Sequence, residues 1–515
     1  MAARVLVLGL DAADATLIRE GIADGTLPTF ARLFADAPEL TLDNTLTTLP
    51  GAIWPEIATG RSSGKTGFYF PPRQLRTGEA VPRPVEADEV DPTSFWTLAS
   101  DADARVAVVD YPWWPLKPGL NGIQVAEWGT HDRPFGSDGL AFSEPPPLAS
   151  ELTARYGPYP MTANGIIGTA TRAACDDHDS SDAAYQTLLS DLVAGIELKT
   201  QLLVDLLQRE EWDLFVAVFG EPQCAGHQMW HLLERAAAHP SEGANDPVRE
   251  IYRRLDQASA TLMDAAGEQA VAVVIASHGM GRPAGGPQLI PEVLLRLGLG
   301  SGHGATAGVR TRLPGPVKKL ARLIIRGKLQ QRAREAVGSL AHPLESSETS
   351  AAALDGDRCS WIRINVDGRE PFGTVAPDRA PAMVEEIRRE LLELRDPATG
   401  VQIVAAASTP METFGVGAHP DMPDLFVSFR EDLGVLETCE SARVGRVHVP
   451  YRTPARRTGA HPTSPTTAWI VGAPEASVAT TGAVTDLAPT ILDLLGLDPP
   501  AGLDGRSLLR RTAVT

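Results

Sequence analysis

The chain has 515 residues, with 46 Lys and Arg against 65 Asp and Glu, which gives a formal net charge of −19. A surface this acidic repels nucleic-acid backbones and acidic membranes, so these polyanions are excluded as general partners. Any small anionic substrate must instead be held by a local site such as a bound metal. The four cysteines lack Cys-x-x-Cys spacing, which argues against a disulfide framework and a thiolate zinc site and predicts reduced thiols in a cytoplasmic protein. The oligomeric state stays open.

The first apolar run, Val5–Leu10, predicts a buried strand rather than an export signal. It has about six apolar residues, fewer than the roughly 7–15 of a signal-peptide core, and Asp11 stands where a small cleavage-site residue would be. No run reaches the ~18 apolar residues of a spanning helix, so we expect no membrane anchor.

Short apolar runs without alternation are typical of strands that are covered on both faces. They are Val5–Leu10, Val106–Val109, Leu214–Phe219, Val271–Ala276, Asp424–Phe429 and Trp469–Val471. Helical patterns lie between them, at Thr16–Phe34, Asp182–Gln208, Pro247–Ala266, Ala380–Leu394 and Thr485–Leu495. This alternation predicts an α/β fold with a mostly parallel central sheet and helices on both faces.

Residues 282–350 interrupt the pattern. They contain Pro283, a glycine-rich stretch at Gly298–Gly308 and a basic stretch at Arg310–Arg334. We interpret them as an inserted helical cap, which leaves 1–281 and 351–515 as the main domain. The basic stretch is either a lid that attracts anions or a solvated amphipathic helix.

Chemistry in parallel sheets gathers at the carboxyl ends of the strands. Asp11, Glu221 and His278 each follow an apolar run by one to three residues, so we expect them at one edge. A helix N-cap is the alternative role for Asp11, and a satisfied core position is the alternative for His278.

Further candidate metal ligands come from two loops. Glu221, His227 and His231 lie in one predicted loop shaped by Pro222 and Gly226, where a histidine that caps a helix is the alternative. His461 lies in an Arg-Thr-Gly-Ala-His stretch. A single histidine in a loop is weak evidence, and His461 is a candidate only because of its position along the chain relative to the other candidate ligands. Imidazoles and carboxylates are the groups that hold catalytic divalent cations.

The C-terminal stretch 484–496, followed by Leu-Asp-Gly-Arg-Ser-Leu at 503–508, is similar to the close of the phosphodiesterase/nucleotide pyrophosphatase branch of the alkaline phosphatase superfamily. The resemblance, to a divergent bacterial subgroup, extends over nearly the whole chain. It implies an alkaline phosphatase-like sandwich, two metal ions and a Thr or Ser nucleophile. It places Asp11, His227, His278 and His461 at family ligand positions.

Two departures concern the ligands. Gln223 and Ser277 stand where the family has aspartates, and the loss of two negative charges should weaken binding or leave one ion. Glu221, His231 or Asp132 could serve as a supplementary ligand. A histidine-rich set suits zinc or manganese, or Fe²⁺, better than magnesium.

A third departure concerns the nucleophile, because its expected position falls on Pro50. Thr48 is the nearest hydroxyl and Thr47 the next. A helix N-terminus here would stabilise an alkoxide or a bound phosphate, although Pro50 is equally well explained as a structural first-turn proline. A metal-activated water is the alternative nucleophile.

The segment 361–373 is similar to a segment of the divergent subgroup. Arg363, Asn365 or Arg369 could line a substrate pocket, or could belong to a strand and turn with surface charges.

The leading hypothesis is a metal-dependent hydrolase of phosphodiester or nucleotide pyrophosphate-like esters. One alternative is a phosphoryl- or sulfuryl-group transferase in a biosynthetic pathway. The other is a degenerate member that binds an anion without turnover.

Overall fold

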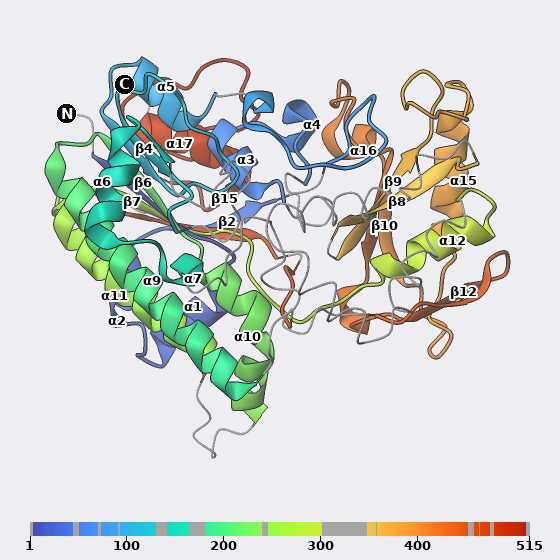
Figure 1. Cartoon of the computed structure of the whole chain (residues 1–515), viewed down its shortest axis with the longest axis horizontal. Helices are drawn as coiled ribbons and strands as arrows, with labels where there is room; N and C mark the ends of the chain where they lie inside the picture. Colours follow the sequence, from blue (N-terminus) through green and yellow to red (C-terminus); the bar gives the residue numbers. More distant parts are fainter. Residues whose placement is uncertain are drawn as a thin grey trace, which may run out of the picture. The chain divides into compact units, whose positions relative to one another are not determined.

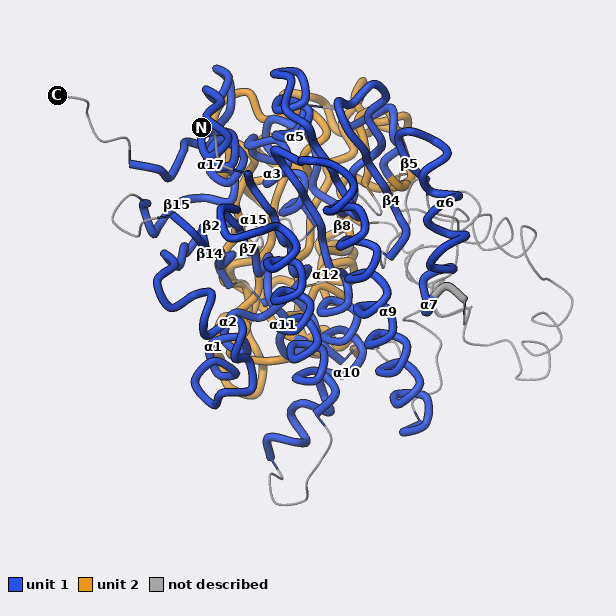
Figure 2. Tube along the Cα trace, turned by 90° about the vertical axis from the view of Figure 1, so that its left-hand side faces the viewer, with its two compact units in different colours: residues 1–72, 85–283, 453–515 blue, residues 73–84, 284–452 orange. Residues whose placement is uncertain are grey.

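The computed structural model describes residues 4–44, 51–70, 74–90, 93–129, 142–163, 181–238, 246–300, 344, 348–356, 358–451, 458–462, 464–473 and 478–510. The chain divides into two compact units, coloured separately in Figure 2. Unit 1 comprises Met1–Pro72, Val85–Pro283 and Thr453–Thr515, and unit 2 comprises Arg73–Pro84 and Ala284–Arg452.

Unit 1 is built on a nine-stranded sheet of mixed but mostly parallel pairing (Figure 1). In spatial order its strands are β15 (Thr481–Ala483), β2 (Glu39–Asp43), β14 (Thr466–Val471), β7 (Val271–Ala276), β1 (Val5–Leu10), β6 (Leu214–Phe219), β3 (Val106–Val109), β4 (Gly122–Ala126) and β5 (Phe142–Glu144). Strand β14 runs antiparallel to both of its neighbours, and β5 runs antiparallel to β4.

The central strands are buried on both faces, which explains their unbroken apolar runs. Along β1, Leu6 and Leu8 belong to one hydrophobic core, while Val5 and Val7 belong to the other. The first core includes side chains from α1 (Ala15–Ala23), α2 (Pro28–Phe34), α6 (Pro147–Tyr156), α7 (Pro160–Ala163), α9 (Asp182–Arg209), α10 (Glu221–Ala238) and α11 (Pro247–Ala266). The second includes side chains from α3 (Ile53–Thr59), α5 (Phe95–Asp101) and α17 (Leu487–Leu494). Helices therefore cover both faces, as predicted.

Local signals set the helix bounds. Helix α11 keeps its predicted limits because Asp246 accepts a hydrogen bond from the Arg249 amide, Pro247 begins the first turn and Gly267 ends the last one. The predicted single helix at 16–34 is wrong. It is two helices, α1 and α2, separated by a turn in which Gly25 takes a φ of +79°.

Unit 2 has a sheet and a core of its own. Its antiparallel strands are, in spatial order, β10 (Val404–Ser408), β11 (Leu425–Phe429), β9 (Cys359–Ile364) and β8 (Ala351–Gly356). Helices α12 (Ile290–Arg296) and α15 (Ala380–Leu392) pack on this sheet. The unit also contains α16 (Pro410–Phe414) and the hairpin β12 (Thr438–Ser441) and β13 (Gly445–His448).

The predicted domain division, with a cap at 282–350, stays a prediction. Unit 2 begins at Ala284 and continues to Arg452. The apolar run at 424–429, expected in the main sheet, instead pairs with β9 and β10. Most of the predicted cap, 301–343, lies outside the described residues, so its helical character stays a prediction.

No helix in the described part of the chain is long and apolar enough to cross a membrane. The three described cysteines, Cys224, Cys359 and Cys439, are buried and form no disulfide, and Cys175 lies outside the described residues.

Candidate functional site

The carboxyl ends of β7, β1 and β6 bring polar residues to one edge of the main sheet. These three strands are adjacent and parallel. The Asp11 amide donates to the Phe219 carbonyl at 2.9 Å, and the Ser277 amide donates to the Leu10 carbonyl at 3.3 Å. His278 follows directly. The prediction that the residues following β1, β6 and β7 lie at one edge of the sheet is confirmed.

Asp11 is 6% exposed and is held by an indole. The Trp54 Nε1–H donates to Asp11 Oδ1 at 2.7 Å. The ring reaches this place because residue 9 is glycine, where a Cβ would lie 2.5 Å from Trp54. Burial, followed by the charge of Asp11, raises the pKa of Tyr111, whose hydroxyl donates to the Trp54 carbonyl at 2.8 Å. The N-cap of α1 is Asp14, not Asp11.

Ser277 connects the loop after β1 to His278. Its Oγ accepts a hydrogen bond from the Ala12 amide at 2.9 Å, lies 2.7 Å from His278 Nδ1 and lies 3.4 Å from Asp11 Oδ1. His278 Nδ1 is itself 3.9 Å from Asp11 Oδ1. The turn after His278 depends on Gly279, whose φ is +68°.

Residues 221–231 form the first turns of α10, so the prediction of a loop is wrong. Pro222 is the second residue of the helix, where the missing amide proton costs no intrahelical hydrogen bond. Gly226 permits close packing, since a Cβ there would lie 2.6 Å from Met280. The helix places His227, which is 5% exposed, nearly two turns from its start.

The segment 458–462 is docked on α10 by a reciprocal set of hydrogen bonds. The amides of Thr458 and Gly459 donate to the His227 carbonyl at 2.7 and 3.0 Å. In return, His227 Nδ1 lies 2.9 Å from the Gly459 carbonyl. A Cβ on Gly459 would lie 2.3 Å from the Gly226 carbonyl. Only glycine therefore allows this approach of segment and helix.

His461 stands between the other two histidines. Its ring centroid is 4.6 Å from that of His227 and 4.2 Å from that of His278, both in edge-on geometry. Its Nδ1 lies 3.2 Å from the Gly279 carbonyl. The structure thus gathers Asp11, His227, His278 and His461 from four separate segments. We call these residues the histidine cluster.

Hydrogen bonding fixes the tautomers of two of these rings. A carbonyl oxygen only accepts, so Nδ1 of His227 and of His461 carries the proton. In a neutral imidazole the lone pair is then on Nε2, the nitrogen that would bind a cation. Imidazoles and a carboxylate suit zinc or manganese, so the donor chemistry fits a divalent cation. The coordination geometry is not assembled, because no group of three or more His, Cys, Asp or Glu side chains in the described part of the chain is arranged to hold a metal ion.

The possible supplementary ligands have other contacts. His231 Nδ1 lies 3.1 Å from Thr458 Oγ1, and its ring centroid lies 5.1 Å from that of Tyr185. Glu221 belongs to a different cluster, described below. Asp132 lies outside the described residues, as do the predicted nucleophile Thr48, its alternative Thr47 and the Pro50 that displaces them.

The predicted substrate residues lie in unit 2. Arg363 is 1% exposed, its Nε donates to Glu370 Oε1 at 2.7 Å and its Nη1 donates to the Met422 carbonyl at 2.6 Å. The Asn365 amide donates to the carbonyls of Thr349 and Phe372 at 2.9 and 2.8 Å. These contacts favour the strand-and-turn interpretation, and a substrate role stays a proposal.

A second polar cluster, which sequence reasoning missed, adjoins the same sheet edge. Lys199 Nζ lies 2.7 Å from Asp110 Oδ2 and donates to the Val218 carbonyl at 2.5 Å, with both charged side chains fully buried. The Tyr159 hydroxyl donates to Glu221 Oε1 at 2.9 Å. Burial raises the pKa of Glu221, and the charge of Lys199 opposes that shift. We call Lys199, Asp110, Glu221 and Tyr159 the lysine cluster.

A signal for the lysine cluster was present in the sequence. Lys199 falls in the apolar stripe of α9, with Leu192 and Ile196 before it and Leu203 after it at helical spacing. A lysine in such a stripe has to be paired with an acid when it is buried.

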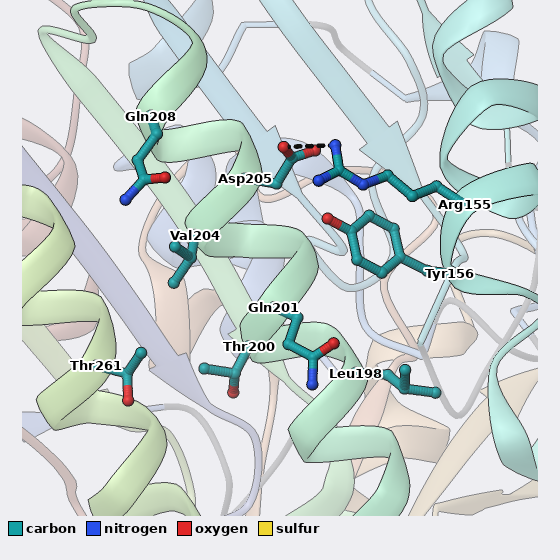
Figure 3. Close-up of a pocket in the computed structure, with 9 residues that line it drawn as sticks. All are labelled: Arg155, Tyr156, Leu198, Thr200, Gln201, Val204, Asp205, Gln208 and Thr261. Atoms are coloured by element: carbon teal, nitrogen blue, oxygen red, sulfur yellow. Dashed lines mark hydrogen bonds and ion pairs between the residues drawn. The ribbon is translucent and has the colours of Figure 1, made fainter.

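A surface hollow of about 530 Å³ lies on α9. No residue of the histidine cluster or the lysine cluster lines it. Figure 3 shows Arg155, Tyr156, Thr200 and Asp205 around it, with Arg155 and Asp205 joined by an ion pair of 2.7 Å. Its lining includes no predicted site residue.

Three comparisons with known proteins bear on this geometry. The model of the family described as type I phosphodiesterase/nucleotide pyrophosphatase matches residues 5–448. The solved structure of alkaline phosphatase PafA has a TM-score of 0.56 at 12% identity, covering 99% of this chain and 98% of that chain. This likeness confirms the predicted alkaline phosphatase-like α/β fold.

Two further similarities are weaker or shorter. Murine ectonucleotide pyrophosphatase/phosphodiesterase 5 has a TM-score of 0.49 at 10% identity, covering 98% of this chain and all of that chain. The 2,3-bisphosphoglycerate-independent phosphoglycerate mutase of Paracoccus denitrificans (strain Pd 1222) is 44% identical over 52 residues, which is 10% of this chain and 10% of that protein. The chain thus spans about a tenth of the length of this curated relative.

Proposed function

The chain belongs to the type I phosphodiesterase/nucleotide pyrophosphatase family, and on that premise we propose that it is a metal-dependent hydrolase of small phosphodiester or nucleotide pyrophosphate-like esters. The observation that carries the proposal is the histidine cluster. Three imidazoles with centroids 4.2 and 4.6 Å apart, next to a buried carboxylate, gather at the carboxyl edge of a mostly parallel sheet. Such edges are where α/β proteins bind ligands.

The residues of the cluster have distinct tasks in this proposal. His227 and His461 would hold a divalent cation through Nε2, because their Nδ1 atoms donate to backbone carbonyls. His278 and Asp11 would complete the set from the ends of β7 and β1. When bound, the cation supplies a Lewis acid for the phosphoryl oxygen and lowers the pKa of a water molecule.

Two nucleophiles are compatible with the proposal. Thr48 precedes the Ile53–Thr59 helix and is the nearest hydroxyl to the family position. A water molecule is the alternative, and it requires no hydroxyl at Pro50. Thr48→Val would separate them, since loss of hydrolysis at unchanged metal content supports Thr48, whereas retained hydrolysis supports water.

The proposal is tested by elemental analysis of protein purified without a metal-affinity tag. We expect zinc or manganese in wild type and in the control His231→Ala, because His231 contacts Thr458 rather than the cluster. Metal should be lost in His227→Ala and His461→Ala, together with hydrolysis of bis(p-nitrophenyl) phosphate. Wild-type protein that stays metal-free after supplementation with zinc and manganese would sink the hydrolase proposal and leave the anion-binding alternative.

A phosphoryl transferase is the second candidate. The short match to a phosphoglycerate mutase is the observation that favours it. Turnover of a phosphate ester in the presence of an alcohol such as glycerol distinguishes the two. A transferase forms a phosphorylated acceptor with little free phosphate, while a hydrolase forms the same products with or without the acceptor.

A further inference from the structure

The side chain of Ser277 occupies a central place beside the histidine cluster that the proposed function leaves unexplained. It is fully buried, and its single hydroxyl meets three polar groups. These are the Ala12 amide at 2.9 Å, His278 Nδ1 at 2.7 Å and Asp11 Oδ1 at 3.4 Å. A serine hydroxyl has one proton to donate and two lone pairs to accept with.

Counting protons gives one arrangement that satisfies all three contacts. The Ala12 amide can only donate, so it takes one lone pair of Ser277 Oγ. Asp11, when ionised, can only accept, so the hydroxyl proton points to Oδ1. The remaining lone pair then accepts from His278 Nδ1, which must carry the proton. The lone pair of the neutral His278 ring is consequently on Nε2.

The opposite arrangement fails on two counts. If the Ser277 hydroxyl donated to His278 Nδ1, its contact with Asp11 Oδ1 would bring two oxygens together without a proton. The neutral His278 ring would then carry its one N–H proton on Nε2, and this nitrogen could not bind a cation.

We propose that Ser277 is a positioning residue that relays a hydrogen bond from His278 Nδ1 to Asp11 and so sets His278 in the tautomer that binds a cation through Nε2. The proposal rests on the proposed function in that it concerns the same metal site. Trp54 supports the relay from the other side, because its indole N–H donates to the same Asp11 oxygen at 2.7 Å. Second contacts of this kind typically change metal affinity about 10–100-fold.

The relay gives the three histidines a common pattern. His227 and His461 direct Nδ1 to the carbonyls of Gly459 and Gly279, while His278 directs Nδ1 to a hydroxyl that is itself oriented by a carboxylate. In each ring the nitrogen left to bind the cation is Nε2.

The test reads the tautomer directly in metal-free protein. Long-range ¹H–¹⁵N NMR correlations of protein labelled with ¹⁵N-histidine, at about pH 8 where imidazole is neutral, separate a protonated ring nitrogen from an unprotonated one. The signals of His278 are identified by their loss in His278→Gln. We expect protonated Nδ1 in wild type and a loss of this preference in Ser277→Ala. Ser277→Thr, which keeps the hydroxyl, should restore it.

A matched control removes a different buried hydroxyl. Ser259 of α11 is 2% exposed in the same unit, and Ser259→Ala should leave the His278 signals and the zinc affinity unchanged. Zinc titration of the same samples should show a 10–100-fold weaker dissociation constant for Ser277→Ala alone.

The outcomes separate this inference from the proposed function. Protonated Nε2 on His278 in wild type, or an unchanged tautomer in Ser277→Ala, overturns the relay even if the protein binds zinc. A protein with the expected tautomers that binds neither zinc nor manganese retains the relay and refutes the metal-dependent hydrolase.

Discussion

The histidine cluster and the lysine cluster adjoin the same edge of one sheet but balance their charges differently. In the lysine cluster, the ammonium of Lys199 lies 2.7 Å from Asp110 and is fully buried with it. In the histidine cluster, Asp11 is surrounded by neutral donors, namely an indole N–H and a serine hydroxyl. The carboxylate of Asp110 thus lies beside a lysine, whereas the carboxylate of Asp11 accepts from neutral donors and lies 3.9 Å from His278 Nδ1.

On the proposed function, an external cation would be bound at the histidine cluster. A buried carboxylate next to a lysine has no electrostatic need of a metal, whereas a carboxylate among imidazoles gains from one. In this view the lysine cluster is the structural part of the sheet edge, and the histidine cluster is the part proposed to bind a ligand. Substitutions that alter one cluster should leave the other largely intact.

The largest expected effect is on stability, from Lys199→Met. The substitution leaves Asp110 buried without its cation, and breaking a buried pair in this way costs about 3–5 kcal/mol. Urea unfolding monitored by circular dichroism measures the change. The control is Lys65→Met, which removes the half-exposed partner of Asp504 and should cost less than about 1 kcal/mol. Equal losses in the two variants would contradict the structural role of the lysine cluster.

Gly459→Ala should break the histidine cluster and spare the lysine cluster. Its Cβ would lie 2.3 Å from the backbone carbonyl of Gly226, so the segment that carries His461 must shift. We expect zinc affinity to fall by about 100-fold, which is the upper end of the effect of removing a residue that supports a metal ligand. In Gly226→Ala the new Cβ meets the flexible Met280 side chain, and a smaller loss is expected. Similar zinc affinity in wild type and Gly459→Ala would argue against His461 as a ligand.

Tyr159→Phe should weaken the lysine cluster moderately. It removes the hydroxyl that donates to the buried Glu221 at 2.9 Å, and an unsatisfied buried acceptor costs about 1–3 kcal/mol. Tyr156→Phe, which removes a hydrogen bond to Asp205 on a partly exposed neighbouring residue, is the control and should lower the free energy of unfolding by less than Tyr159→Phe does. Metal content should stay at the wild-type level in both, and a loss in Tyr159→Phe would show that the two clusters are coupled.

Glu221→Gln should have the smallest effect, visible as a change in pH dependence. Burial raises the pKa of Glu221 above its ordinary value of 4.5, so the folded chain binds this proton more tightly than the unfolded chain. The contribution of Glu221 to stability is therefore present at low pH and is lost as pH rises from about 4.5 through the folded pKa. Relative to wild type, Glu221→Gln should become more stable across that window. Parallel stability curves would contradict the raised pKa.

Much of the sheet could be predicted from the sequence because its strands are buried on both faces. The runs at 5–10, 106–109, 214–219 and 271–276 coincide with β1, β3, β6 and β7. The run at 424–429 was placed in the wrong sheet, because an apolar run shows burial but not its pairing partner. The helix at 221–238 was missed because Pro222 and Gly226 indicate a turn, whereas here they serve the first turn and a close contact.

The candidate site was predictable only for its titratable members. The motifs around Asp11, His227, His278 and His461 identified side chains that the structure does bring together. Trp54, Gly9 and Gly459 could not be identified as parts of the site, since an indole N–H or a missing Cβ matters only through contacts between distant segments. Ser277 appeared in the sequence as a lost carboxylate, and its contacts with the Ala12 amide, His278 and Asp11 could not be foreseen there.

The position of β14 in the sheet has a consequence for synthesis on the ribosome. This strand lies between β7 and β2, and His461 is in the short segment that precedes it. Until β14 has been made, β2 lacks its connection to β7 and the last histidine of the cluster is absent or newly made. A nascent chain therefore carries Asp11, His227 and His278 without the complete cluster while residues 279 to 460 are made. A cation held by all four side chains would be bound only once β14 can join the sheet, as a step that reports a correctly closed sheet.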